Sequence, residues 1–369
     1  MEVLEILKTF IYGIGRLAIR PIFLLLILLL GGAFSISPGS ELSSTSTAGS
    51  TRYTVTSLSY QANGINPTGQ VVGYNNQNNQ AFRFTPTKPN GTSGTLVNLG
   101  TLGGTVSLAE AINGSGQVVG YSTLADGTYR AFLYSNGRLY NIGTLGAAYG
   151  VGYGINASGQ VVGSSYTKAN LDHAFLWTPS TPNGTSGKMI DLGTLGGQSS
   201  SAYGVNKNGE AVGYAYRSDG NFRAFLYSNG TMKDLGTLGG DWSRADGMND
   251  ADQIVGQAYL RANVSAHACL WQNGTIKDLG TLGGTYSEAY GINSSGSQIV
   301  GYSDVPSNSG YLVSHAFLYS NGVMQDLNKS IPANSGWVLA QATGVNDAGQ
   351  IVGYGTLNGQ QKGFLLTPQ

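Results

Sequence analysis

The sequence predicts an all-β fold, a seven-bladed β-propeller whose last blade is closed by a strand from the N-terminal side. A phrase close to Asp-Leu-Gly-Thr-Leu-Gly-Gly recurs along the 369-residue chain. Each copy also contains four short runs rich in Val, Ile, Tyr and Phe, and the chain stops after the third run of the last copy. Four strands in a repeat of about 45 residues are typical of a propeller blade.

An asparagine anchors each copy, two residues after a Gly or Ala, and the seven anchors lie 43 to 53 residues apart. They are Asn66, Asn113, Asn156, Asn206, Asn249, Asn293 and Asn346. In the sixth copy we expect strands at residues 288–293, 298–303, 315–319 and 323–327. Ser-Asn-Gly usually joins the last two strands, as suits a type I′ turn. Copies one and three carry a longer Pro-Asn-Gly-Thr-Ser-Gly insert there.

The two ends of the repeat array indicate how the ring closes. The last copy ends at residues 363–369 without a fourth strand, and residues 53–58 precede the first anchor, where other copies carry the glycine phrase. We expect residues 53–58 to complete the last blade and so remove its open edge. An open solenoid would need polar caps at both ends, and the sequence shows none. Residues 51–369 are therefore predicted to form one seven-repeat propeller.

The first fifty residues read as a targeting segment rather than as part of the fold. Lys8, Arg16 and Arg20 precede an apolar run over residues 21–36. This is the pattern of an export signal, and we expect cleavage after Ser35. The alternative is an uncleaved anchor, although the run is shorter than the ~20 residues of a spanning helix. Either way residues 1–36 are the only membrane contact expected, residues 37–50 form a Ser/Thr/Gly-rich linker, and the repeats are exported, either outside the cell, on its surface or in the periplasm.

Charge and cysteine content narrow the class of function. The 19 basic and 19 acidic residues leave a formal net charge of zero. No basic stripe favours a nucleic-acid partner. The single cysteine, Cys269, stands where sister repeats have Phe, so we expect a buried thiol without a disulfide. A catalytic thiol would need a base, and only His267 is near in sequence.

No cofactor and no metal site is predicted. The histidines His173, His267 and His315 share one repeat slot at the start of the third strand, where equivalent positions of a ring diverge. We expect them to be polar and solvent-facing rather than metal ligands. The asparagine turns carry too few carboxylates for calcium. The Gly-Gly phrase lacks the lysine of a phosphate loop, and is expected to serve as a sharp crossing between blades.

The candidate site lies on one face of the ring. The loops between second and third strands vary most and are rich in hydroxyl, amide and tyrosine side chains, and they share that face with the Gly-Gly crossings. They cover residues 75–79, 123–129, 166–172, 216–222, 258–266, 304–314 and 355–361. Variable loops on a rigid ring favour ligand binding, here of carbohydrate or of a protein surface. The candidate binding residues are Glu110, Tyr129, Asp241, Trp242, Asp246, Glu288 and Tyr311.

An enzyme is the alternative. Glu110, Asp246 and Glu288 belong to first strands near the axis, and Asp241 and Trp242 are expected in a crossing loop. An extracellular polysaccharide hydrolase or lyase could use the three axial acids, but sequence alone pairs none of them. We therefore predict no catalytic residue and a monomeric binding module.

The His-Ala-Phe-Leu-Trp run at residues 173–177 and the His-Ala-Phe-Leu-Tyr run at 315–319, with the glycine phrases, resemble the HAF family of extracellular repeat proteins. The resemblance covers residues 53–366. Ala147, Cys269, residues 362–364 and the connection 326–332 depart from the pattern. It implies an exported bacterial protein, and it brings no established activity or catalytic residue.

Overall fold

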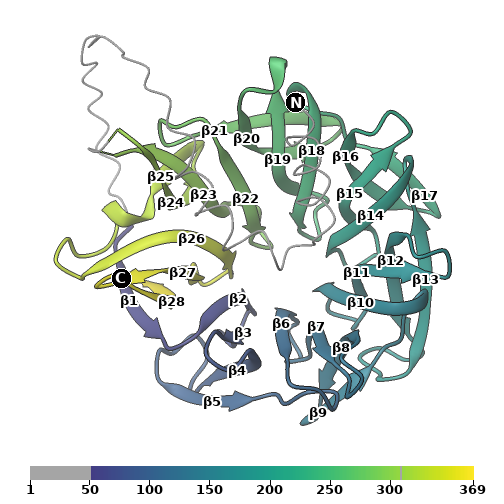
Figure 1. Cartoon of the computed structure of the whole chain (residues 1–369). Coiled ribbons are helices and arrows are strands. Elements are labelled where there is room, and N and C mark those ends of the chain that lie inside the picture. Colours follow the sequence, from purple (N-terminus) through teal and green to yellow (C-terminus); the bar gives the residue numbers. More distant parts are fainter. Residues whose placement is uncertain (1–50, 308–309) are drawn as a thin grey trace. The chain divides into compact units, whose positions relative to one another are not determined.

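The computed structural model describes residues 51–307 and 310–369, and these form a ring of seven four-stranded antiparallel sheets (Figure 1). Six blades use consecutive strands. Blade 1 contains β2 (Gln61–Ile65), β3 (Val71–Asn75), β4 (Gln80–Pro86) and β5 (Gly94–Asn98). Blade 2 contains β6 (Ser107–Ile112), β7 (Val118–Thr123), β8 (Tyr129–Ser135) and β9 (Arg138–Asn141). Blade 3 contains β10 (Gly146–Ile155), β11 (Val161–Thr167), β12 (Asp172–Pro179) and β13 (Gly187–Gly193).

The later blades follow the same plan. Blade 4 contains β14 (Gly196–Val205), β15 (Ala211–Arg217), β16 (Phe222–Ser228) and β17 (Thr231–Asp234). Blade 5 contains β18 (Gly239–Met248), β19 (Ile254–Leu260), β20 (Ala266–Gln272) and β21 (Thr275–Gly280). Blade 6 contains β22 (Ser287–Ile292), β23 (Gln298–Pro306), β24 (Leu312–Ser320) and β25 (Val323–Asp326). Two 3₁₀ turns, η2 (Arg261–Asn263) and η3 (Leu327–Lys329), interrupt the strands. The seven-bladed prediction is confirmed.

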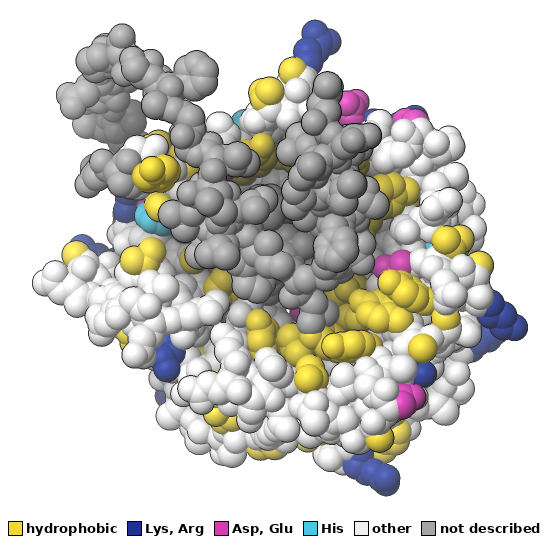
Figure 2. Space-filling model, in the orientation of Figure 1, with side chains coloured by type: hydrophobic (Ala, Val, Ile, Leu, Met, Phe, Trp, Pro, Cys, Tyr) yellow, Lys and Arg dark blue, Asp and Glu magenta, His cyan; other side chains and the backbone are white. Residues whose placement is uncertain are grey.

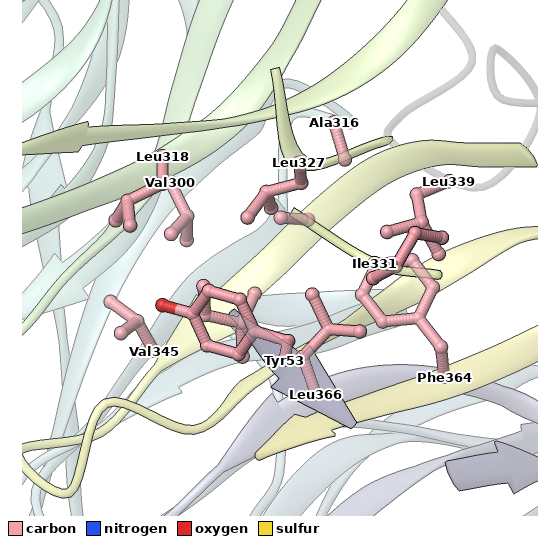
Figure 3. Close-up of a cluster of buried hydrophobic side chains, with 12 residues drawn as sticks. Tyr53, Val300, Ala316, Leu318, Leu327, Ile331, Leu339, Val345, Phe364 and Leu366 are labelled. Atoms are coloured by element: carbon pink, nitrogen blue, oxygen red, sulfur yellow. The ribbon is translucent and has the colours of Figure 1, made fainter. Parts of the chain in front are cut away.

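Blade 7 confirms the predicted closure, because its sheet order is β1-β28-β27-β26. Here β1 (Tyr53–Leu58) pairs antiparallel with β28 (Gln360–Pro368), while β26 (Trp337–Val345) and β27 (Ile351–Leu357) complete the sheet. Tyr53 is 1% exposed and packs with Leu366 and with Leu318 of blade 6 (Figure 3). Burial raises the pKa of Tyr53 to about 12. The closing strand thus contributes both edge pairing and core packing.

The hydrophobic core is divided among the interfaces between blades. Every pair of neighbouring blades around the ring shares its own buried apolar cluster. The Phe of the His-Ala-Phe run is buried in six blades, and Cys269, 0% exposed, takes its place in blade 5 as predicted. Burial raises the pKa of this thiol. Because each blade repeats the same buried positions, the sequence period translates directly into the ring.

The glycine phrase is a structural crossing, as expected. In the step from blade 5 to blade 6, the carboxylate of Asp278 accepts a hydrogen bond from the backbone N–H of Gly280 at 2.7 Å. Gly280 has a φ of +76°, which favours glycine. A Cβ on Gly284 would lie 2.6 Å from Asp304 atoms. Ser287 of blade 6 then donates to the Gly280 carbonyl at 2.6 Å and accepts from the Ala268 N–H at 2.8 Å, which fastens the two blades together.

The anchor asparagines do more than form turns. In blade 2, Asn113 Oδ1 accepts the backbone N–H groups of Ser115 and Gln117 at 3.2 and 3.0 Å, as an Asx turn does. Its Nδ2 donates to the Asn156 carbonyl of blade 3 at 3.1 Å. Equivalent bonds leave Asn66, Asn156, Asn249 and Asn346, and the last reaches Asn66 across the closure of the ring. We call the side that carries these turns the anchor face.

The two Pro-Asn-Gly inserts also belong to the anchor face. Asn183 lies on the anchor turns of blades 2 and 3, because its carbonyl accepts from Gln117 Nε2 at 2.9 Å and its N–H donates to the Ser158 carbonyl at 2.8 Å. Asn90 accepts in the same way from Gln350 of blade 7 at 3.1 Å. The inserts are therefore clamps between blades rather than free loops.

The opposite side carries the Gly-Gly crossings and the hairpins between second and third strands, and we call it the loop face. Two boundaries differ from the sequence prediction. Asp241 and Trp242 lie inside the long strand β18 rather than in a crossing loop. Most of the predicted loop 304–314 continues the β23–β24 ladder, with Asp304 opposite Ser314 and Pro306 opposite Leu312. On blade 6 the added backbone pairs across the ladder, whereas Asp241 and Trp242 lie in an irregular step of β18, where the Asp241 N–H donates to the Asn263 side chain.

The histidine prediction was partly wrong. His173 and His267 lie second in their third strands and His315 lies fourth in β24, but none is simply solvent-facing. The Nδ1 of each lies 2.9 Å from the carboxylate of an Asp on the fourth strand of its blade, in the pairs His173–Asp191, His267–Asp278 and His315–Asp326. The side chains of these histidines are only 16 to 21% exposed. The pairs brace the outer strand against its neighbour, and sequence spacing did not reveal the partner.

Residues 1–50 lie outside the described residues, and so do the predicted export segment and linker. None of the helices found in the described part is long and apolar enough to cross a membrane.

Candidate functional site

The first strand of every blade carries a β-bulge at the same step, and the bulge selects the residues at the axis. The register shifts at Asn63, Glu110, Tyr153, Tyr203, Asp246, Tyr290 and Thr343. A bulge leaves one residue unpaired and re-aims its side chain. The repeat therefore presents seven equivalent positions with seven freely varied side chains, which is the arrangement from which a site can be built.

Tyrosines dominate on blades 2 to 4. Tyr121 of β7 contacts Tyr129 of β8 with ring centroids 5.5 Å apart, and Tyr129 reaches Tyr149 of blade 3 at 6.3 Å. Tyr149 in turn lies 4.8 Å from Tyr166. The rings thus cross the boundary between blades 2 and 3 without a break.

A second run of rings continues from blade 3 to blade 5. The bulge residues Tyr153 and Tyr203 contact at 4.9 Å, and Tyr203 contacts Tyr214 at 6.0 Å. Phe222 then joins Tyr214 at 5.3 Å to Trp242 of β18 at 4.7 Å. We call the two runs together the aromatic track; its members are Tyr121, Tyr129, Tyr149, Tyr153, Tyr166, Tyr203, Tyr214, Tyr216, Phe222 and Trp242.

The track has a buried floor and an accessible upper edge. Tyr121, Tyr153 and Tyr203 are at most 6% exposed, whereas Tyr129 is 39% exposed. The remaining members are half-buried. Figure 2 shows hydrophobic side chains gathered on this face over the inner strands of blades 2 and 3. Rigid aromatic rings held in this way form a preorganised surface for a ligand.

One carboxyl group lies among these rings. Asp172 begins β12 directly opposite Tyr166. Its Oδ1 is shut off from solvent and has no hydrogen-bond partner among the described residues. Burial raises the pKa of Asp172 to about 7, although Ser164 and His173 oppose the rise. A carboxyl group whose pKa is shifted by burial on an accessible face is a functional-site candidate.

Two of the three axial acids, Asp246 and Glu288, are brought together by an arginine that sequence reasoning did not single out. Arg244 Nε lies 3.1 Å from Asp246 Oδ1, and its Nη2 bonds Glu288 of blade 6. Tyr290 donates to the same Glu288 at 2.9 Å. Burial opposes the ionisation of Glu288, but the charge of Arg244 and the hydrogen bonds with Asp246, Tyr290 and Arg244 together outweigh burial and lower the pKa of this carboxyl. One cation is thus shared by two carboxyl groups, and Arg244 also lies over the Tyr203 ring at 5.9 Å.

The predicted binding residues divide between this track and other places. Tyr129 and Trp242 belong to the track, while Asp246 and Glu288 form the adjoining network with Arg244. Glu110 is 9% exposed and lies 3.4 Å from the amide of Asn63. The remaining two are separate: Asp241 bonds Asn263 on the exterior, and Tyr311, 57% exposed on blade 6, makes no ring contact with the track in the described structure.

The sequence analysis missed Tyr121, Tyr149, Tyr214, Asp172 and Arg244. The sequence did contain a usable signal. Four residues at the ends of the predicted loops belong to the track, namely Tyr129, Tyr166, Tyr216 and Phe222. Asp172 is the last residue of one of these loops. Two of the contacts between blades, Tyr129–Tyr149 and Phe222–Trp242, could not be foreseen, because they join residues at different repeat positions.

Comparison with known proteins adds the fold alone. No family model matches the chain, and no curated protein sequence matches it. The solved structures that resemble it include the β-propeller domain of the trilobed protease from Pyrococcus furiosus, with 7% identity, 84% of this chain and 95% of that chain covered, and a TM-score of 0.47. A TolB-like protein from Agrobacterium tumefaciens shows 12% identity, 62% and 89% coverage, and a TM-score of 0.44.

An acylaminoacyl peptidase from Pyrococcus horikoshii shows 9% identity, with 81% of this chain covered and a TM-score of 0.49. The aligned region spans 49% of that peptidase, about half its length. At these identities and TM-scores the resemblances assign no activity to this chain. The resemblance to the HAF family stays a prediction.

Proposed function

We propose that this protein is an exported binding module that holds a carbohydrate chain against the aromatic track of the loop face. The observation that supports the proposal is the unbroken series of ring contacts from Tyr121 to Tyr166 and from Tyr153 to Trp242. Aromatic faces carry negative charge density, and the C–H face of a sugar ring carries the opposite polarity. Tyrosine and tryptophan add this contact at a low cost in side-chain entropy.

A carbohydrate fits the track better than a protein surface does. Tyr129 is exposed and the other accessible rings are half-buried, and ring contacts link four successive blades, so they offer a narrow series of stacking positions. A protein interface would require a broader patch with an apolar core. A linear glycan can place successive sugars on successive rings, so affinity should rise with chain length.

The test is calorimetric titration of the protein with neutral oligosaccharides of one to six units, drawn from gluco-, xylo-, manno- and N-acetylchito-series. We expect binding that strengthens with length. Tyr129→Ala and Trp242→Ala should each weaken it by about tenfold, the loss expected for one stacked ring. Tyr311→Ala is the matched control, since it removes an exposed tyrosine outside the track. Loss of binding in the control but not in Tyr129→Ala would place the site on blade 6 instead.

The rival proposal is a polysaccharide hydrolase or lyase that uses the axial acids. A hydrolase needs one protonated carboxyl as general acid. Arg244 contacts both Asp246 and Glu288, and the lowered pKa of Glu288 favours its ionised form, which does not suit a general acid. We prefer the binding proposal, and the cleavage assay tests the remaining axial acid, Glu110, as well. The same glycans should be assayed for cleavage, with Glu110→Gln and Glu288→Gln in parallel, and turnover abolished by either change would establish the enzyme.

Export and membership of the HAF repeats are part of this proposal and rest on the sequence. Fractionation of cells that express the full chain should place the propeller outside the cytoplasmic membrane, and N-terminal sequencing should find cleavage after Ser35. Protein recovered from the cytosol with residues 1–36 intact would contradict export.

A further inference from the structure

We infer that the loop face carries two equivalent glycan-binding sites, so that one molecule of the protein binds two short glycans at once. Each site is a triad of aromatic side chains at the boundary between two blades. The first triad is Tyr129, Tyr149 and Tyr166 between blades 2 and 3, and the second is Phe222, Trp242 and Tyr259 between blades 4 and 5. This inference rests on the proposed function. It adds the number of sites and the residues that form each of them.

Three repeat positions meet at each blade boundary that carries the glycine phrase. The first lies at the start of the third strand of one blade, and the second lies two residues after the end of the phrase that leads into the next blade. The third lies on the second strand of that next blade, opposite the start of its third strand. The end of the phrase packs against this third position, because a Cβ on Gly197, Gly240 or Gly284 would lie 2.6 to 2.7 Å from the Cβ of Tyr216, Tyr259 or Asp304.

The two triads are the boundaries of this kind that have an aromatic residue at all three positions. The others have at most one: Asn79, Val106 and Thr123 between blades 1 and 2; Asp172, Ser199 and Tyr216 between blades 3 and 4; and Ala266, Tyr286 and Asp304 between blades 5 and 6. The crossing between blades therefore does not itself require aromatic residues. The triads depart from the repeat in the way that is expected of a binding site.

The triad between blades 2 and 3 is a set of rings in contact. Tyr129 contacts Tyr149 across the boundary at 6.3 Å, and Tyr149 contacts Tyr166 at 4.8 Å. Tyr121, which is 1% exposed, contacts Tyr129 at 5.5 Å and supports it from the core. Tyr129 is 39% exposed, and Tyr149 and Tyr166 are half-buried. A sugar can therefore reach rings that are already held in place, which lowers the entropic cost of binding.

The triad between blades 4 and 5 repeats these contacts. Phe222 contacts Trp242 across the boundary at 4.7 Å. Tyr214 contacts Phe222 at 5.3 Å, and it has the same register position on its strand as Tyr121 has on blade 2. Phe222, Trp242 and Tyr259 are half-buried. The same positions, two blades further along the ring, thus form the same kind of accessible aromatic surface.

An arginine marks both triads. Arg130 and Arg223 follow the first triad position directly, in the repeat slot that holds Gln, His or Lys in the other blades. The Nη1 of Arg130 donates to the Tyr129 carbonyl at 3.0 Å and to the Ala148 carbonyl at 2.7 Å, which ties blade 2 to the crossing of blade 3. The Nη1 of Arg223 donates to the Phe222 carbonyl at 3.5 Å. Arginine recurs where the triads recur, which supports their equivalence independently of the rings.

The boundary between blades 3 and 4 separates the two triads. Its first two positions are Asp172 and Ser199, which offer no ring to a sugar. The rings of Tyr153 and Tyr203 meet beneath this boundary at 4.9 Å, but they are at most 6% exposed. The accessible rings therefore fall into two groups, and a glycan too short to cross this boundary has two places to bind.

The experiment counts the sites by calorimetric titration with the shortest neutral oligosaccharide that binds in the series above. Wild-type protein should bind two molecules of it. Tyr129→Ala should weaken one site about tenfold and leave the other unchanged, and Trp242→Ala should do the reverse. Tyr286→Ala is the matched control, because it removes a half-buried tyrosine from the second position of a boundary that is not a triad. The control should keep both sites.

Tryptophan fluorescence assigns the sites, because Trp242 belongs to one triad only. Trp177 and Trp271 are 2% and 3% exposed, so a glycan does not reach them. The fluorescence response to the same oligosaccharide should persist in Tyr129→Ala and be lost in Trp242→Phe. Trp242→Phe keeps an aromatic ring, so calorimetry should still find two sites in it. Thermal melting of each variant checks that the ring of blades is folded.

The outcomes separate this inference from the proposed function. One bound oligosaccharide per wild-type molecule, weakened by both Tyr129→Ala and Trp242→Ala, overturns the inference and leaves the proposed function standing. The inference also fails if Tyr129→Ala abolishes the fluorescence response of Trp242, since both residues would then belong to one site. Absence of binding to any glycan of the series overturns both.

Discussion

The two faces of the ring are made from the same seven repeats, yet they use them in opposite ways. On the anchor face the same residue, asparagine, recurs in every blade. The side chains of Asn113 and Asn346 form hydrogen bonds both to their own turns and to the next blade. Along the first strands, by contrast, the equivalent bulge positions at the axis vary from Asn63 to Tyr153 to Asp246. The anchor face therefore maintains the ring, while the loop face is free to collect the aromatic track. In a propeller, positions that keep the same residue in every blade stabilise the ring, and positions whose residue varies between blades are candidates for function.

The largest effect should come from removing the strand that holds both faces in one ring. Deletion of residues 51–58 exposes the edge of β28 and removes the buried side chains of Tyr53 and Leu58, with a loss of about 5 kcal/mol. We expect a fall in melting temperature of about 10 °C or more and association of the product. A monomeric product with an unchanged melting temperature would show that the closing strand does not stabilise the ring. Thr54→Ala, on the same strand but exposed, is the control.

A single anchor substitution should damage stability and leave the loop face working. Asn113→Ala removes a buried amide that accepts two backbone N–H groups and donates to blade 3. We expect a loss of about 2–3 kcal/mol in the free energy of unfolding, measured in denaturant. Lys207→Ala, an exposed side chain on the anchor turn of blade 4, should change it by less than about 0.5 kcal/mol. Equal effects would mean that the asparagine bonds are not what makes this face rigid.

The pH dependence of stability should distinguish the two faces further, because burial of the Asp172 carboxylate on the loop face destabilises the fold. Its folded pKa of about 7 lies above the ordinary aspartate value of 3.8, so its contribution to stability is most favourable below about pH 4 and is lost as the pH rises towards and past 7. Asp172→Asn should therefore raise the melting temperature relative to wild type at pH 8, by an amount that corresponds to about 2 kcal/mol, and have little effect at pH 4. A constant difference across that range would assign the effect to packing instead.

The smallest effect on stability is expected at the accessible edge of the track. Tyr129 is 39% exposed, so Tyr129→Ala should lower the free energy of unfolding by less than about 1 kcal/mol. The same change should weaken glycan binding more than any anchor-face variant that remains folded. Thermal melting and titration of one preparation compare the two quantities directly. A variant that loses stability and affinity in parallel would show that the two faces are not separate.

Most of the fold was predictable, and the reason is visible in particular residues. Asn66 and Asn346 bond across the closure because every repeat has this asparagine at the same place, so one copy informs all the others. The site was predictable only at its edges. Trp242 was predicted in a crossing loop and lies in a strand, and Asp246 and Glu288 were predicted without Arg244, which forms ion pairs with both.

The sequence by itself determined the number of blades, the closing strand, and the face on which variation gathers, because strand pattern and turn chemistry act within one repeat and recur at one period. Only the tertiary structure decided which varied side chains meet. Tyr129 reaches Tyr149, and Phe222 reaches Trp242, across boundaries between blades, and the first-strand bulges turn Tyr153 and Tyr203 towards each other. The same packing desolvates Asp172 and raises its pKa. These contacts depend on the angle between neighbouring blades, and burial is a property of the assembled ring.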